Sequence, residues 1–130
     1  MIGTTPIWEA IHSGAQDAAN LVDVDLTWIK PINGVFDSTV MASQIAQAAD
    51  TGLYDGLVVT IPNSEIANAV IQVQRDYVGL PLVVMNVGMQ TAAQLGVLAV
   101  LQDEIAAGEL IGNALLDKGE LLSLVSHCWT

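Results

Sequence analysis

The chain has 130 residues, of which 52% are hydrophobic, and this is enough for one domain with an aliphatic core. Fourteen acidic residues oppose three basic ones, so the formal net charge is -11 at pH 7, which argues against nucleic acid and anionic membrane surfaces as partners. The single cysteine, Cys128, excludes an internal disulfide and a cysteine-rich metal site.

The sequence contains neither a candidate membrane span nor a recognisable signal peptide. No apolar run approaches the roughly 20 residues that a membrane-spanning helix needs. Residues 1–6 lack the charged region and the apolar core of a cleavable signal. On this evidence the protein is either cytosolic or a mature or trimmed form of a longer precursor.

A helix followed by a strand is predicted at the start of the chain. Apolar residues recur at helical spacing over 7–21, with Thr5 as a plausible N-cap and His12 as a surface or boundary residue. Residues 22–29 alternate between apolar and polar, which predicts a strand near a sheet edge with one face in water. Trp28 lies on the inward side of that strand and is expected in the core.

A nearly unbroken apolar run over residues 57–61 predicts the central strand of the fold. It is rich in β-branched residues and is stopped by Pro62-Asn63-Ser64, so we expect a strand buried on both faces. Helices are predicted on either side of it, over residues 38–51 and 65–77, and ligands of open parallel sheets bind beyond the carboxyl ends of such strands.

The remaining elements complete a pattern in which strands alternate with helices. The expected N-caps are Asp37 or Ser38, Ser64 and Asp103. The later elements are a strand at 82–85, a short helical turn at 91–95, a strand at 97–101, a helix at 104–118 and a strand at 121–125. This order predicts an α/β fold: one domain over residues 1–130, with an open parallel sheet of about five strands and helices on both faces.

The order of these elements resembles the N-terminal lobe of type I periplasmic binding proteins for sugars, a fold shared with LacI-type regulator cores. The matching segments are GAQDAA at 14–19, DGLVV at 55–59 followed by Pro62, LPLVVMN at 80–86 and QDEIAAG at 102–108. They extend over essentially the whole chain but over only one lobe of the family. The resemblance implies a carbohydrate-binding module that is not an enzyme and that works outside the cytoplasm or is secreted.

The resemblance also implies a ligand site. In that family two lobes close on a sugar, and each lobe contributes contacts from the loops that follow its strands. By position these contacts are Trp8, Asn63, Asn86, Gln102 and Asp103. An aromatic ring stacks on the apolar face of a sugar, while amides and carboxylates hydrogen-bond its hydroxyl groups. No cofactor and no metal is implied, and a single lobe is expected to bind a free sugar only weakly.

The family's first central strand is represented here by Met1 and Ile2 alone, while residues 121–125 match the first strand of the second lobe. We expect the segment Leu121 to Val125 to fill the gap between the strands at Val24 and Val58. It would do so within one chain or from a second copy by strand swapping, which predicts a homo-oligomer.

Two groups of side chains suggest catalysis or ion binding, and each has a simpler explanation. His127 and Cys128 are adjacent on an extended segment, so they face opposite sides and do not form a nucleophile–base pair. Asp55 with Asp103 and Glu104 suggests a carboxylate pair or a cation site. The simpler explanation is the stronger one: a turn role for Asp55 and a capping role for Asp103 each suffice to account for the aspartate.

Two other functions stay open beside sugar binding. One is a secreted interaction or effector-type protein that keeps the scaffold without the sugar site and acts through self-association or a protein partner. The other is an enzyme on a flavodoxin-like sheet. The sequence contains no G-x-G-x-x-G, P-loop or zinc-spacing motif, so nucleotide and metal chemistry lack support.

Overall fold

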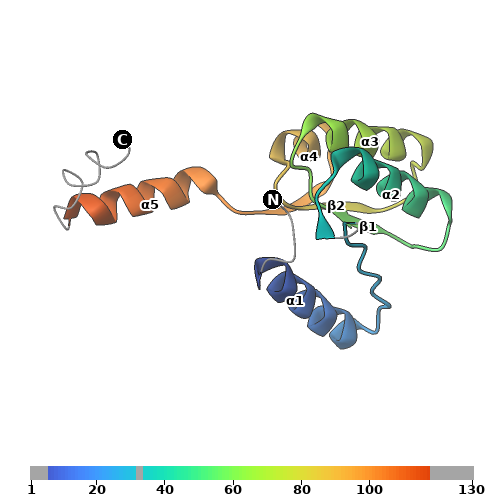
Figure 1. The fold of residues 1–130 in the computed structure, drawn as a ribbon, viewed down its shortest axis with the longest axis horizontal. Coiled ribbons are helices and arrows are strands. Elements are labelled where there is room, and N and C mark those ends of the chain that lie inside the picture. Colours follow the sequence, from blue (N-terminus) through green and yellow to red (C-terminus); the bar gives the residue numbers. More distant parts are fainter. Residues whose placement is uncertain (1–5, 32–33, 118–130) are drawn as a thin grey trace.

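The computed structural model describes residues 6–31 and 34–117 and shows an α/β fold with a parallel sheet, which confirms the predicted class (Figure 1). The described elements are α1 (Pro6–Val22), α2 (Ser38–Asp50), β1 (Leu57–Val59), α3 (Ser64–Asp76), β2 (Leu82–Asn86), α4 (Met89–Leu95), β3 (Leu98–Leu101) and α5 (Glu104–Asp117). The predicted cap Thr5, the predicted strand 121–125 and the pair His127–Cys128 lie outside the described residues.

The described sheet has three strands in the order β1-β2-β3, all parallel, rather than the predicted five. Val58 pairs with Val83, and Val83 pairs with Leu98. The strand predicted to be central, β1, therefore lies at an edge of the described sheet, and β2 is the middle strand. The segment predicted to lie on its other side, residues 121–125, is outside the described residues, and residues 22–29, predicted as the strand beyond that segment, form no strand.

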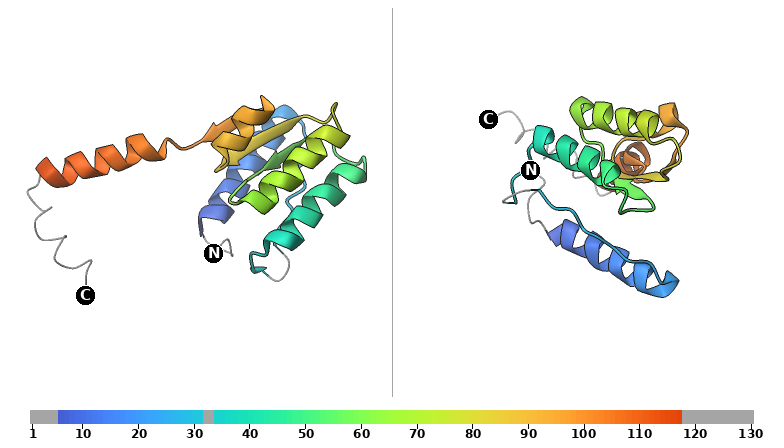
Figure 2. Two further views of the ribbon diagram at one scale, coloured as in Figure 1. Left: turned by 90° about the horizontal axis from the view of Figure 1, so that it is seen from above. Right: turned by 90° about the vertical axis from the view of Figure 1, so that its right-hand side faces the viewer.

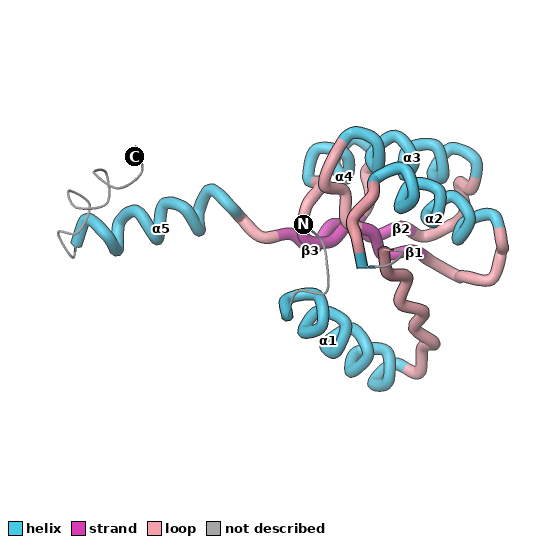
Figure 3. The backbone as a smooth tube through the Cα atoms, viewed as in Figure 1, coloured by secondary structure: helices cyan, strands magenta, loops and turns pink. Residues whose placement is uncertain are grey.

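Helices α2, α3 and α4 cover one face of the sheet (Figures 1 and 3). The core lies between them and the strands, and Ile66, Val70 and Val84 are its largest fully buried side chains. Each connection from one strand to the next runs through a helix on this same face, as right-handed crossovers in one direction require. This half of the fold follows the helix and strand periodicity of the sequence closely.

The opposite face of the sheet is largely open, although helices were expected on both faces. Val58 is 62% exposed, Leu98 69% and Val100 66%. The prediction that the strand at 57–61 is buried on both faces is therefore wrong. Helix α1 lies on this side of the sheet (Figures 1 and 2) but leaves these three side chains exposed.

Residues 22–29 do not form the predicted strand. Helix α1 extends to Val22, and the segment that follows it pairs with no strand of the described sheet. Instead it returns along α1, where the ring of Trp28 lies over that of His12 with the centroids 4.8 Å apart. Both residues are half-buried, so Trp28 is a boundary residue and not part of the main core. An alternating pattern needs a neighbouring strand to become a sheet, and the described residues provide none for this segment.

Side-chain caps fix the starts of three helices. Asp37 accepts a hydrogen bond from the backbone nitrogen of Val40, at 3.1 Å, as predicted. The cap of α3 is Asn63, whose Oδ1 accepts from the nitrogen of Ile66 at 3.0 Å, and not the predicted Ser64. Ser64 is the first helical residue, because the amide oxygen one position earlier already satisfies the free N–H group.

Helices α2 and α3 run parallel and are joined at both ends by side-chain hydrogen bonds. At their amino ends, the hydroxyl groups of Ser38 and Thr39 donate to the carboxylate of Glu65. At their carboxyl ends, the Tyr77 hydroxyl donates to Asp50 Oδ1 at 2.8 Å. The pair therefore has a fixed register over the sheet.

Helix α5 extends away from the sheet and from all the other helices (Figures 1 and 3). Its start is capped by Asp103, whose Oδ1 accepts from the nitrogen of Ala106 at 2.9 Å, as predicted. Ile105 and Leu110 on this helix are 76% and 71% exposed. Within the described part of the chain, no helix is both long and apolar enough to cross a membrane.

Candidate functional site

Three of the five predicted ligand residues line one hollow beyond the carboxyl ends of β2 and β3. Asn86 follows β2, and Gln102 and Asp103 connect β3 to α5. The hollow has a volume of about 270 Å³, and its lining is completed by Val87, Gly88, Met89, Leu101 and Ile105. The parallel sheet thus brings Asn86 close to Gln102 and Asp103, which lie sixteen and seventeen positions later in the chain. They meet at the carboxyl ends of the strands, where ligands of such sheets bind.

The turn from Asn86 to Gly88 shapes one wall of this hollow. Asn86 has a φ of 66°, a left-handed conformation that asparagine tolerates better than most residues. The nitrogen of Val87 donates to the carbonyl oxygen of Met85 at 2.8 Å, and its own carbonyl accepts from the nitrogen of Ile61 at 3.0 Å. The turn is therefore tight and is tied to the chain just after β1.

Gly88 lets this turn lie directly against the core. Its φ is 123°, and a Cβ atom placed on it would be 2.7 Å from Cβ of Ile61 and 3.0 Å from Cγ1 of Val84. Real Cβ atoms do not approach other carbons so closely, so only glycine fits without movement of the strand. The position of the hollow relative to the sheet depends on this contact.

The polar groups of the hollow differ in how far they are already engaged. Asp103 uses Oδ1 for the cap of α5, and its other carboxylate oxygen has no hydrogen-bond partner among the described residues. Gln102, like Asn86 and Asp103, is exposed to solvent. The hollow therefore presents one carboxylate and two carboxamides beside the apolar side chains of Met89 and Ile105.

Trp8 and Asn63, the other two predicted ligand residues, do not line this hollow. Asn63 caps α3, so its side-chain oxygen is occupied. Trp8 is half-buried in the first turn of α1. That end of α1 lies on the side of the molecule where the strands end (Figures 1 and 2), but on the open face of the sheet. The stacking role of Trp8 stays a prediction.

Asp55 cannot form a carboxylate pair with Asp103. Asp55 precedes β1, whereas Asp103 follows β3. In a parallel sheet these two positions lie at opposite ends of the strands, Asp55 at the amino ends and Asp103 at the carboxyl ends. Among the residues that the structure describes, no three histidine, cysteine, aspartate or glutamate side chains gather closely enough to hold a metal ion. The alternative of a shared acid–base or cation site through Asp55 is therefore wrong.

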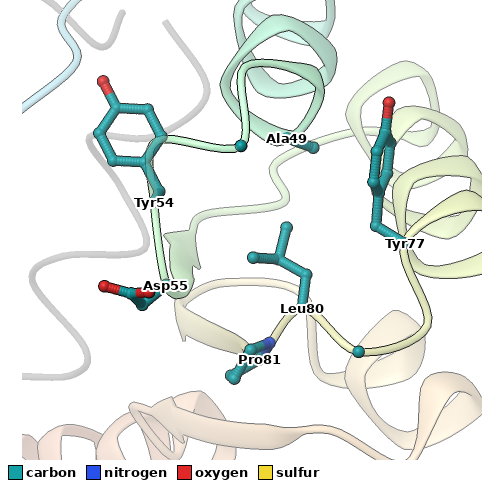
Figure 4. Close-up of a pocket in the computed structure, with 8 residues that line it drawn as sticks. Ala49, Tyr54, Asp55, Tyr77, Leu80 and Pro81 are labelled. Carbon is teal, nitrogen blue, oxygen red and sulfur yellow. The ribbon is translucent and has the colours of Figure 1, made fainter.

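A second hollow of about 410 Å³ lies at the amino edge of the sheet, and the sequence did not point to it. Figure 4 shows Tyr54 and Asp55 on one side of Leu80 and Tyr77 on the other. The Tyr77 hydroxyl is already bound to Asp50, and this hydrogen bond raises the pKa of Tyr77. The sequence feature that could have indicated this hollow is the pair of tyrosines, one in the turn before β1 and one after α3. This hollow gathers fewer free hydrogen-bonding side chains than the hollow at Asn86.

Comparison with protein-family models, with curated proteins and with solved structures finds no match to this chain. The likeness to type I periplasmic binding proteins therefore stays an expectation from sequence segments.

Proposed function

We propose that the chain is a carbohydrate-binding module that holds a small sugar without transforming it. The observation that carries the proposal is that Asn86, Gln102 and Asp103, selected from sequence, line one hollow beyond the ends of β2 and β3. Ligands of parallel α/β sheets bind at this edge. The volume of about 270 Å³ is near the lower end of ligand pockets, which suits a monosaccharide.

The chemistry of the lining fits a sugar. The two carboxamides each donate and accept hydrogen bonds, and the second oxygen of Asp103 accepts from a hydroxyl group. Met89 and Ile105 offer apolar surface to the C–H groups of a sugar ring. Because the hollow is open on one side, we expect dissociation constants in the millimolar range, on the order of 4 kcal/mol of binding free energy.

Isothermal calorimetry with glucose, galactose, ribose and arabinose tests this function. We expect at least one of these sugars to bind. The substitution Gln102→Ala is expected to raise the dissociation constant of that sugar at least about fivefold, since one good hydrogen bond is lost. Gln94→Ala is the matched control, because Gln94 is an exposed glutamine on α4 that does not line the hollow. Equal effects of the two glutamine variants, or no binding of any of the four sugars, would contradict the proposal.

A second candidate is an interaction protein that acts through self-association, and the open edge of β1 favours it. The nitrogens of Leu57 and Ile61 donate to the chain at β2, so the backbone groups of Val58 and Thr60 face the other edge. The Thr60 hydroxyl is buried and has no hydrogen-bond partner among the described groups. An added strand would pair with the backbone groups of Val58 and Thr60, and the segment Leu121 to Val125 is the candidate in the sequence.

Deleting residues 120–130 tests this second candidate. If the segment completes the sheet at β1, the shortened chain is expected to lose cooperative thermal unfolding, measured by circular dichroism. A shortened chain that unfolds as sharply and at the same temperature as the full chain would exclude the strand addition.

A further inference from the structure

The open face of the sheet is a continuous apolar surface. Val58, Val83 and Leu98 are paired across the three strands, and Met85 is paired with Val100 in the next row on the same face. Three of these side chains are more than 60% exposed. Parallel sheets are normally covered on both faces, because their strands bury apolar side chains on each side. This face therefore lacks its covering layer within the described chain.

Helix α5 has the opposite deficiency. It carries large apolar side chains that the described part of the chain leaves mostly uncovered: Ile105, Leu110, Ile111 and Leu116 are each more than 60% exposed. The helix has a fixed start, since Asp103 caps it, but it contacts no other described element extensively. An isolated helix of 14 residues is marginal in water unless its apolar side packs on something.

The handedness of chain connections relates these two surfaces. The path β1–α3–β2–α4–β3 moves across the sheet in one direction, and its helices lie on one face. A right-handed connection that leaves β3 and returns toward β1 moves in the opposite direction, so its helix belongs on the other face. The helix that follows β3 is α5, and the other face is the open one.

We propose that α5 of one copy packs on the open sheet face of a second copy, which returns the exchange to form a two-fold dimer. Helix α5 points away from its own sheet (Figure 1), so a second copy is the occupant that fits the observed direction of the helix. Only Gln102 and Asp103 connect β3 to α5, and so short a connection favours exchange between copies over folding back.

The size of the contact fits a weak dimer that forms as the protein concentration rises. A helix of 14 residues is about 21 Å long and about 10 Å wide. Two such helices on two sheet faces bury roughly 800 Å² when both sides of each contact are counted, which is smaller than a standard specific interface. The contact surface on the strands carries no charged side chain, since β1, β2 and β3 contain none. Each copy has a net charge of -11, so we expect added salt to strengthen the dimer by screening repulsion.

Light scattering after size-exclusion chromatography tests the exchange with two variants and one control. Leu98→Lys alters the sheet face, and Leu110→Lys alters α5. Val78→Lys is the control, because Val78 is 81% exposed in the loop after α3 and lies on neither surface. We expect the first two substitutions each to raise the dissociation constant of the dimer at least about tenfold, because a charge would be buried without a partner, and the control to leave it unchanged.

Mixing the two variants identifies the contact itself. In a mixed dimer, the intact α5 of the Leu98→Lys copy meets the intact sheet face of the Leu110→Lys copy. One of the two contacts is thereby restored, so the equal mixture is expected to form more dimer than either variant alone.

Circular dichroism confirms that each variant is folded before mixing. A full-length chain that is monomeric at all concentrations, folded variants that dimerise as well as the control, or a mixture that gains no dimer would overturn the proposal.

Discussion

Gly88 shows most directly how one residue positions the candidate site. It combines a φ of 123° with the absence of room for a Cβ atom beside Ile61. We expect Gly88→Ala to lower the free energy of unfolding by at least about 2 kcal/mol, since both backbone strain and a clash result. Urea denaturation followed by circular dichroism measures this difference.

Gly96→Ala is the matched control for that experiment. Gly96 has a φ of 66°, but no atom lies within 4 Å of the position its Cβ would take. The Gly96→Ala substitution should therefore lower the free energy of unfolding by only about 1 kcal/mol, from the strained backbone alone. Equal losses at the two glycines would show that the turn at Gly88 does not lie against Ile61 and Val84.

Glu65 makes stability depend on pH. Hydrogen bonds from Ser38 and Thr39 hold the pKa of this carboxyl group below its ordinary value. A carboxylate with a lowered folded pKa stabilises the protein fully above the unfolded value, and this contribution is lost as the pH falls through the folded pKa. Glu65→Gln is therefore expected to reduce the melting temperature at neutral pH but to have a smaller effect in acid.

Thermal melts of the two proteins across the acidic range check this expectation. Because Glu65 is exposed, the difference between them should be small at every pH and should decrease below about pH 4.5. A difference that grows as the solution becomes more acidic would contradict the hydrogen bonds from α2.

Residue patterns predicted helix caps where the chemistry was local. Asp37 and Asp103 cap helices as expected, because an aspartate followed by a helical segment has one dominant use. Asn63 and Ser64 are both good capping residues at adjacent positions, and spacing alone does not decide between them. The pairing of Asp55 with Asp103 failed because the two residues lie at opposite edges of a sheet, which only the strand direction reveals.

At the scale of elements, the stability of the fold comes from the layer of α3 against the sheet. Ile66 is 1% exposed at the start of α3 and belongs to the core cluster with Val84. We expect Ile66→Ala to lower the free energy of unfolding by about 2–5 kcal/mol, because the lost methyl groups leave a cavity. Val78→Ala, at an exposed position, should change it by no more than about 0.5 kcal/mol.

Chemical denaturation of these two variants locates the core. A loss below about 1 kcal/mol for Ile66→Ala would show that α3 does not pack on β1 and β2 in solution.

The helices α2 to α5 and the strands β1 to β3 were predictable from apolar period and caps, within a few residues. The segment 22–29 was not, although its alternation is the clearest in the chain. Strand formation depends on a partner that supplies hydrogen bonds, and periodicity reports only the side chains. Trp28 accordingly packs on His12 of α1 and not on a sheet. Val58 is exposed because no described element covers its side chain on the open face of the sheet.

For the whole molecule, the arrangement combines a well-packed helical face with an open apolar face and a helix that extends from the body. The sequence predicted the parallel direction of the strands, since alternating helices and strands leave little choice. It did not predict that the layers would be incomplete on one side. That depends on where α1 and α5 lie relative to the sheet, which residue period does not encode.

The most direct test of the proposed function is to map a sugar onto the molecule by nuclear magnetic resonance. A titration of the ¹⁵N-labelled chain with glucose, galactose, ribose or arabinose is followed through backbone amides and the side-chain amides of Asn86 and Gln102. We expect the shifts to concentrate at 86–89 and 101–105, around the hollow beyond β2 and β3. Shifts that concentrate at Tyr54 and Tyr77 beside the opposite edge, or no shifts with any of the four sugars, would contradict it.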